Sequence, residues 1–151
     1  MSKVISIINQ KGGVGKTTST INLGCALAKQ GQKILVIDLD PQGNASTGLG
    51  IEPSTRLKPI YEFLLNPEQD PSAFIINSKI ENLDIITANV DLSGLEVETA
   101  GDSRRAFKLK DELTPILNDS KPLYDYIIID CPPSLSLLTI MALVASDALV
   151  V

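Results

Sequence analysis

Histidine and tryptophan are absent from this chain of 151 residues, and cysteine occurs only twice. The two cysteines, Cys25 and Cys131, lie far apart among apolar residues and form no C-x-x-C pair. The sequence therefore lacks the usual ligands of a zinc site, and it lacks the imidazole of a His-dependent triad or general base. We expect both cysteines to be reduced and buried, because a free cysteine behaves as a small hydrophobic residue.

Positive charge is also scarce, with 13 Lys and Arg against 18 Asp and Glu and a net charge of -5. This balance argues against nucleic-acid binding by bulk electrostatic attraction. No apolar run approaches the roughly 18 residues of a membrane span. The apolar run at residues 4–8 is too short for a signal peptide and leads into a polar glycine loop. We therefore expect a cytoplasmic protein.

Short apolar runs alternate with helical patterns along the chain. Strands are predicted at residues 3–8, 33–38, 83–88, 124–130 and 147–151, and helices at 18–31, 60–65, 103–117 and 135–145. This alternation predicts an α/β fold in three layers, with a mainly parallel sheet covered by helices on both faces. Residues 1–151 form one predicted domain. It ends in an apolar strand without a covering helix, so we expect it to be incomplete at the C-terminus, an N-terminal portion of a longer protein.

One segment lacks either pattern. Residues 41–59, PQGNASTGLGIEPSTRLKP, are rich in Gly, Pro, Ser and Thr. This composition predicts a long, mobile loop. Within the helix expected at 103–117, Pro115 is predicted to lie near the end or to kink it.

Residues 9–18 read NQKGGVGKTT and match a phosphate-binding loop between a strand and a helix. Backbone N–H groups of such a loop surround an anion at the helix N-terminus. Lys16 is predicted to reach the β- and γ-phosphates, and the Thr17 hydroxyl to bind Mg²⁺. These features predict the fold of a P-loop NTPase that binds a nucleotide and Mg²⁺, and the family resemblance described below implies that the nucleotide is ATP. The predicted nucleotide-binding residues are Lys11, Gly12, Gly13, Val14, Gly15, Lys16, Thr17 and Thr18.

Acidic residues follow two of the predicted strands. Asp130 ends the apolar run IIID, as a Walker B acid does, and is predicted to bind Mg²⁺ directly or through water. Asp38 and Asp40 end the strand that follows the P-loop helix, at the edge of the sheet where a nucleotide binds. We assign Asp38 to the metal neighbourhood and Asp40 to positioning the attacking water.

Two positions depart from the general P-loop pattern. Gln10 stands where that pattern has glycine, and Lys11 adds a second lysine before Lys16. A lysine at the opening of the phosphate cradle adds positive charge where phosphoryl transfer spreads negative charge over the γ-phosphoryl oxygens. In other enzymes an arginine finger from outside the site supplies this charge.

Together these stretches resemble the ParA/Soj chromosome and plasmid partition ATPases, which carry the deviant Walker A motif. The resemblance rests on KGGVGKT, IDLDPQGNASTGLG, ANVDLSGLEVE and YDYIIIDCPPSLSLLTIMALVASDALVV, in that order over essentially the whole chain. It implies that Lys11 reaches the nucleotide of a partner subunit in an ATP-dependent homodimer. It further implies a catalytic set of Lys11, Lys16 and Asp40, and a switch comprising Asp40, Pro41, Cys131, Pro132 and Pro133.

The resemblance also implies partners. Members of that family bind DNA without sequence preference as ATP-bound dimers, associate with the nucleoid, and hydrolyse ATP when a ParB-type centromere-binding protein stimulates them. Family members are longer, so the DNA contacts are expected mostly beyond this chain. Within it, the basic residues Arg104, Arg105, Lys108 and Lys110 form either a solvated helix face, which we favour, or a phosphate-contacting patch.

Two other functions fit parts of the sequence. One is a MinD-like positioning ATPase that cycles on membranes, which would require a C-terminal amphipathic helix outside this sequence. The sequence DPQGN at residues 40–44 favours the partition ATPases over this alternative. The other is a nucleotide-gated binding module without turnover, against which the intact lysines and acids argue.

Overall fold

The structure is a computed structural model, and it describes residues 2–8, 14–118 and 123–151. Six strands form one sheet in the order β3-β4-β2-β5-β1-β6. The strands are β1 (Lys3–Ile7), β2 (Ile34–Asp38), β3 (Ile76–Asn77), β4 (Leu83–Ile86), β5 (Tyr126–Asp130) and β6 (Ala148–Val150). The α-helices are α1 (Val14–Lys29), α2 (Asn44–Gly48), α3 (Ile60–Leu65), α4 (Leu95–Glu98), α5 (Lys108–Leu117) and α6 (Leu137–Ala145). Short 3₁₀ helices span Pro53–Thr55, Pro71–Phe74, Val90–Gly94 and Arg105–Phe107.

The sheet is parallel except for β3, which pairs antiparallel with β4. Strands β2 and β5 are buried along nearly their whole length because the sequences ILVID and YIIID are continuously apolar up to a terminal acid. Such runs suit central strands that are covered on both faces. The carboxyl ends of β1, β2 and β5 therefore lie side by side at one edge of the sheet.

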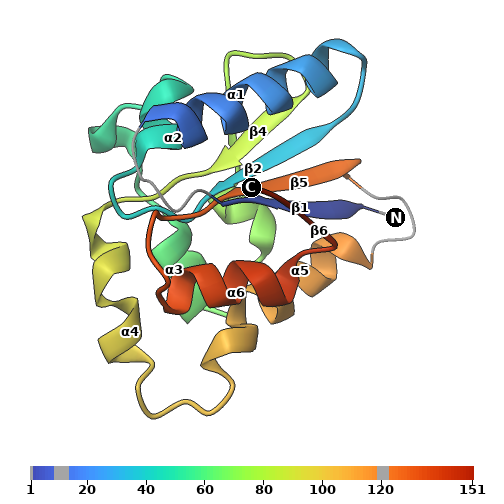
Figure 1. The fold of residues 1–151 in the computed structure, drawn as a ribbon. Helices are drawn as coiled ribbons and strands as arrows, with labels where there is room; N and C mark the ends of the chain where they lie inside the picture. The colour runs from blue at the N-terminus through green and yellow to red at the C-terminus, as the bar shows by residue number, and fades with distance from the viewer. Residues whose placement is uncertain (1, 9–13, 119–122) are drawn as a thin grey trace.

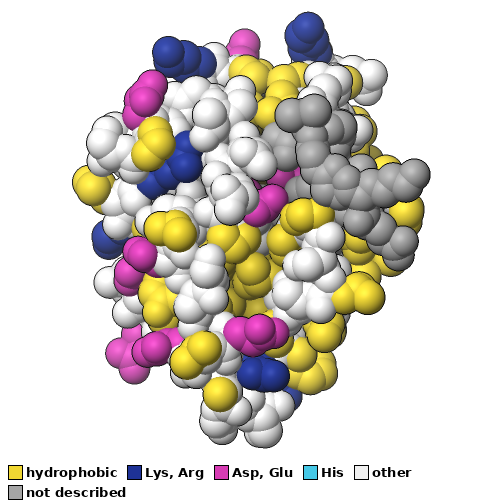
Figure 2. Space-filling model, turned by 60° about the vertical axis from the view of Figure 1, so that its left-hand side comes forward, with side chains coloured by type: hydrophobic (Ala, Val, Ile, Leu, Met, Phe, Trp, Pro, Cys, Tyr) yellow, Lys and Arg dark blue, Asp and Glu magenta, His cyan; other side chains and the backbone are white. Residues whose placement is uncertain are grey.

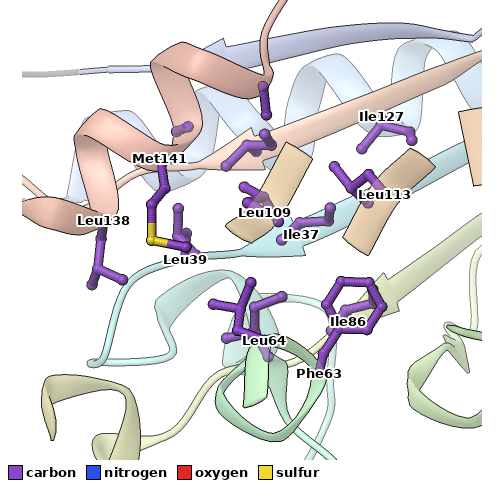
Figure 3. Close-up of a cluster of buried hydrophobic side chains, with 14 of the residues drawn as sticks. Ile37, Leu39, Phe63, Leu64, Ile86, Leu109, Leu113, Ile127, Leu138 and Met141 are labelled. Carbon is purple, nitrogen blue, oxygen red and sulfur yellow. The ribbon is translucent and has the colours of Figure 1, made fainter. Parts of the chain in front are cut away.

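Helices cover both faces of this sheet (Figure 1). On one face α1 and α2 pack over a cluster that includes Ile34, Val36 and Ile128. On the other face α3, α5 and α6 enclose a larger cluster. Figure 3 shows that cluster, where side chains of the strands meet those of the helices; its labelled residues are Ile37, Leu39, Phe63, Leu64, Ile86, Leu109, Leu113, Ile127, Leu138 and Met141. The predicted three-layer α/β fold with a mainly parallel sheet is confirmed.

Some elements differ from those expected in the sequence analysis. The predicted loop at 41–59 is wrong over Asn44–Gly48, which form α2, and Ala45 and Ser46 of that helix are buried. Its Gly, Ser and Thr residues have low helix propensity, so tertiary contacts rather than local preference stabilise it. The two-residue strand β3 was not expected, because it is too short to show alternation.

The cysteines differ from each other in burial. Cys131 is fully buried as predicted, whereas Cys25 on α1 is only half-buried, so the prediction for Cys25 is wrong. Neither cysteine forms a disulfide bond. Pro115 lies inside α5, two residues before its end, and α5 continues to Leu117. Among the described residues no helix is long and apolar enough to cross a bilayer.

Candidate nucleotide site

The predicted site acids Asp38, Asp40 and Asp130 lie at the edge where β1, β2 and β5 end. The pairing register places Asp38 of β2 directly beside Asp130 of β5, and Ile7 of β1 on the other side of Asp130. The backbone continues this contact beyond the strands, since the Leu39 amide donates to the Asp130 carbonyl at 2.9 Å. Two acids that are 92 positions apart in sequence thus become neighbours.

Helix α1 begins close to this edge. Val14, Gly15, Lys16 and Thr17 form its first turn, as the sequence predicts for the end of a phosphate-binding loop. Lys11, Gly12 and Gly13 lie outside the described residues, so their predicted roles remain predictions. Because strand β1 leads toward the N-terminus of a 16-residue helix, the helix dipole favours an anion at this edge.

Asp130 is held in place by a hydrogen bond from α1. Its side chain is fully buried, and the Thr20 hydroxyl donates to Asp130 Oδ1 at 2.7 Å. A buried carboxylate is stabilised by donors of this kind, which also fix its orientation. Thr20 lies one turn after the predicted Mg²⁺ ligand Thr17. The helix that carries Thr17 therefore also carries the residue that binds Asp130.

Asp38 is equally buried, and its carboxylate accepts three hydrogen bonds. Oδ2 accepts from the Ser46 amide at 2.9 Å and from the Ser46 hydroxyl at 2.7 Å, while Oδ1 accepts from the Asp40 amide at 3.2 Å. Burial raises the pKa of Asp38 from 3.8 to about 6; the Ser46 bonds oppose this shift, and the negative charge of Asp130 adds to it. The carboxylate therefore anchors α2 to the end of β2.

Asp40 lies two residues beyond β2, in a tight turn. Its Oδ1 accepts from the Gln42 amide at 3.0 Å, and its carbonyl accepts from the Gly43 amide at 2.8 Å. Gly43 adopts a left-handed φ of 66°, which glycine tolerates without strain. Asp40 is 4% exposed, so this turn keeps its side chain within the edge of the sheet rather than in open solvent.

Two of the other predicted switch residues, Pro41 and Pro132, border a pocket of about 220 Å³. Pro41 and Pro132 line it together with residues of α6 and of the Val90–Gly94 3₁₀ helix. Glu96 of α4 lines it as well, and its Oε1 accepts from the Leu137 amide at 3.2 Å, which caps α6. Figure 2 shows acidic side chains sunk into this face and a hollow with hydrophobic walls below them.

Cys131 joins the switch segment to the central strands. It is fully buried, and its amide donates to the Ile7 carbonyl at 3.2 Å. Pro133, two residues on, is exposed. The segment after Asp130 thus starts inside the sheet and emerges at the surface within three residues.

The basic residues at 104–110 are partly paired with acids of their own surroundings. Arg104 Nη2 lies 3.2 Å from Asp111 Oδ2, and Lys108 Nζ lies 3.4 Å from Asp102 Oδ2. Arg104 also stacks on Phe107, 4.8 Å from the ring centroid. These pairs agree with the solvated face favoured from the sequence.

Comparison with known proteins identifies the family. A family model described as an AAA domain (AAA_31) matches residues 2–151. The chain belongs to this family. Its most similar curated relatives include the sporulation initiation inhibitor protein Soj of Bacillus subtilis, 49% identical over 151 residues, and the chromosome partitioning protein ParA of Caulobacter vibrioides, 47% identical over 149 residues. The resemblance to the ParA/Soj ATPases is therefore confirmed.

This AAA-domain chain is shorter than those relatives. The match to Soj covers 100% of the chain and 58% of Soj, and the match to ParA covers 99% of the chain and 55% of ParA. The chain thus spans little more than half the length of the curated relatives it matches.

Solved structures of related proteins contain nucleotides. Cobyrinic acid a,c-diamide synthase from Mycobacterium smegmatis, with bound ATP analog and magnesium, has a TM-score of 0.89 and 37% identity over 99% of this chain and 57% of that chain. A putative plasmid partition protein from Borrelia burgdorferi, bound to AMPPNP, has a TM-score of 0.80 and 34% identity over 99% of this chain and 60% of that chain. Both likenesses extend over the whole sheet and its helices.

Three residues at this edge were missed from the sequence. Thr20 donates to Asp130 and Ser46 donates to Asp38. The buried Arg56 donates to Thr47 and Ile51 and to Ala88 after β4. Each contact joins residues that are distant in sequence or lie in the segment predicted as a loop. The helical periodicity of 18–31 places Thr20 on α1, but nothing in that pattern indicates its partner.

Proposed function

We propose that the protein carrying this chain is a Mg²⁺-dependent ATPase of the DNA-partition type. The observation that carries the proposal is the register of β2 and β5, which brings Asp38 and Asp130 together at the sheet edge where α1 begins. Phosphate binds at such a helix N-terminus, and Mg²⁺ prefers carboxylate and hydroxyl oxygens. The donor set at this edge, without histidine or a thiolate cluster, fits magnesium better than zinc or copper.

Each residue receives one role. Backbone amides of residues 12–18 cradle the phosphates, and Lys16 binds the β- and γ-phosphates. Thr17 and Asp130 hold the Mg²⁺, which neutralises charge on the phosphate oxygens, and Asp38 supports that shell from its buried position. Asp40 orients the attacking water.

Lys11 acts across a dimer in this proposal. Two subunits bind face to face through their nucleotide edges, and Lys11 of each stabilises the charge that develops on the partner's γ-phosphate. Similarity to the chromosome partitioning protein ParA of Caulobacter vibrioides supports a role in chromosome partitioning. The dimer is proposed to bind DNA without sequence preference through regions mostly beyond this chain, at the nucleoid in the cytoplasm. A ParB-type centromere-binding protein stimulates ATP hydrolysis, which releases the dimer from DNA.

The experiment compares the full-length wild-type protein with Lys11→Ala and Lys16→Ala. Lys16→Ala is expected to abolish nucleotide binding and turnover together. Lys11→Ala is expected to retain ATP binding but to lose both ATP-dependent dimerisation in sedimentation velocity and ATP turnover. A Lys11→Ala variant that dimerises on ATP and turns over normally would refute the cross-dimer role. Lys33→Ala, which removes a lysine from the opposite edge of the sheet, is the matched control.

A further inference from the structure

The segment that follows β2 is fixed by a buried arginine. Arg56 is only 7% exposed, and none of the salt bridges among the described residues includes it. Burying a guanidinium without an opposing carboxylate is costly unless its N–H groups find acceptors. A side chain that merely filled this space would not need a charge.

Three acceptors surround the guanidinium. Nε and Nη2 both donate to the Ile51 carbonyl, at 3.1 and 2.7 Å, and Nη2 also donates to Thr47 Oγ1 at 2.8 Å. Nη1 donates to the Ala88 carbonyl at 3.2 Å. Thr47 and Ile51 belong to the segment after β2, whereas Ala88 follows β4. Arg56 thus fastens that segment to the end of the neighbouring strand.

Ala88 also forms a hydrogen bond toward the candidate site. The Ala88 amide donates to Ser46 Oγ at 3.1 Å, and that hydroxyl donates to Asp38 Oδ2 at 2.7 Å. Ala88 therefore binds Arg56 through its carbonyl and the Asp38–Ser46 pair through its amide. A continuous chain of hydrogen bonds runs from Arg56 to the carboxylate of Asp38.

Arg56 also touches the turn of Asp40. A Cβ added to Gly43 would lie 2.6 Å from Arg56 Nη1 and 2.9 Å from the Ala88 carbonyl oxygen, so the guanidinium rests against the glycine backbone. The Gly43 amide closes the turn by donating to the Asp40 carbonyl at 2.8 Å. Any shift of the guanidinium would therefore displace the turn that orients Asp40.

We propose that Arg56 is a positioning residue: it clamps residues 40–51 against the end of β4 and thereby sets the orientation of Asp40 at the nucleotide edge. The proposal rests on the proposed ATPase function, because it assigns Asp40 a part in turnover. Lysine cannot replace Arg56, since its ammonium lacks the planar fork that reaches three acceptors at once.

The first test measures the clamp without requiring catalysis. Hydrogen exchange is followed by mass spectrometry on the full-length wild-type, Arg56→Lys and Leu57→Ala proteins; Leu57 is 82% exposed and serves as the control. In Arg56→Lys, exchange of peptides covering residues 40–51 is expected to accelerate by at least about tenfold, with peptides of α5 unchanged. Wild-type exchange rates over 40–51 in Arg56→Lys would overturn the clamp.

The second test measures the effect on turnover. Arg56→Lys is expected to lower kcat for ATP by about tenfold or more while KM stays within about twofold, because positioning of the water rather than nucleotide binding is lost. A lower melting temperature with unchanged kcat would overturn the positioning role. A raised KM with unchanged kcat would also overturn it.

A milder pair of variants guards against misfolding. Thr47 is exposed, and Thr47→Val removes one acceptor of the guanidinium whereas Thr47→Ser keeps it. Thr47→Val is expected to shift exchange and kcat in the same directions by a smaller factor, and Thr47→Ser to restore both. Equal behaviour of Val and Ser would contradict the clamp. Absence of ATP turnover in the wild-type protein would refute the proposed function instead, and the exchange result would still decide whether Arg56 holds residues 40–51.

Discussion

At the scale of single residues, two carboxylates at one edge occupy different environments. Asp130 receives the Thr20 hydroxyl, whereas Asp38 receives three donors from the segment that follows it. The amount of burial is the same, since both side chains are fully enclosed. Their partners therefore separate their roles: Asp38 organises the chain around the site, and Asp130 is presented by a rigid strand.

The raised pKa of Asp38 predicts a specific pH dependence of stability. Because the folded state raises this pKa from 3.8 to about 6, it binds the proton more tightly than the unfolded state does. The resulting stabilisation is complete below about pH 4 and is lost as the pH rises through 6. The unfolding free energy of the wild type relative to Asp38→Asn should therefore fall by up to about 3 kcal/mol between pH 4 and pH 7.

Urea unfolding at a series of pH values, without nucleotide or Mg²⁺, measures this difference. Using the variant as the reference removes the contributions of other carboxylates, such as Asp70 and Asp102, whose pKa values are lowered by backbone hydrogen bonds. A stability difference that stays constant from pH 4 to pH 7 would show that Asp38 titrates normally.

At the scale of elements, helix α1 is attached to the sheet by a polar contact as well as by apolar packing. Thr20 is fully buried on the face of α1 that covers β5, and its hydroxyl reaches Asp130 at the end of that strand. The helix that follows the predicted phosphate-binding loop and the strand that ends at the predicted Walker B acid are thus linked directly. This hydrogen bond fixes the N-terminal part of α1 relative to Asp130 at the end of β5.

Thr20→Val tests the link between α1 and β5. Valine keeps the shape of the side chain but removes the donor to the buried carboxylate, which should lower the unfolding free energy by about 1–3 kcal/mol. ATP turnover of the full-length protein should fall as well, because Asp130 loses a contact that orients it. Thr20→Ser, which retains the hydroxyl, should be close to wild type in turnover. Wild-type stability and turnover in Thr20→Val would show that the hydrogen bond has no positioning effect.

Elements also differ in how far the sequence predicts them. The apolar runs at 33–38 and 124–130 predicted β2 and β5 because buried parallel strands need continuous hydrophobic residues. Helix α2 was missed because NASTG has weak intrinsic helix preference, and its stability depends on Asp38 and on packing against α1. Local composition thus predicts the elements that local preference stabilises, and it fails for α2, which tertiary contacts stabilise.

At the scale of the whole molecule, the candidate site is assembled by parallel topology. Residues from β1, β2 and β5 meet because strands that are far apart in sequence end at the same edge. The sequence predicted Asp38 and Asp130 at strand ends, and the P-loop turn at the start of a helix. It could not predict Thr20, Ser46 or Arg56, because their partners are set by contacts across the fold rather than by spacing along the chain.

The account as a whole depends on this edge binding and hydrolysing ATP. The most direct measurement is steady-state, Mg²⁺-dependent ATP hydrolysis by the full-length wild-type protein beside Asp40→Ala and Glu81→Ala. Glu81 is an exposed acid just before β4, at the opposite edge of the sheet, and provides the control. We expect hydrolysis in the wild type and in Glu81→Ala, and a loss of about 100-fold or more in kcat with ATP binding retained in Asp40→Ala. Wild-type hydrolysis by Asp40→Ala, or none by the wild type, would contradict the account.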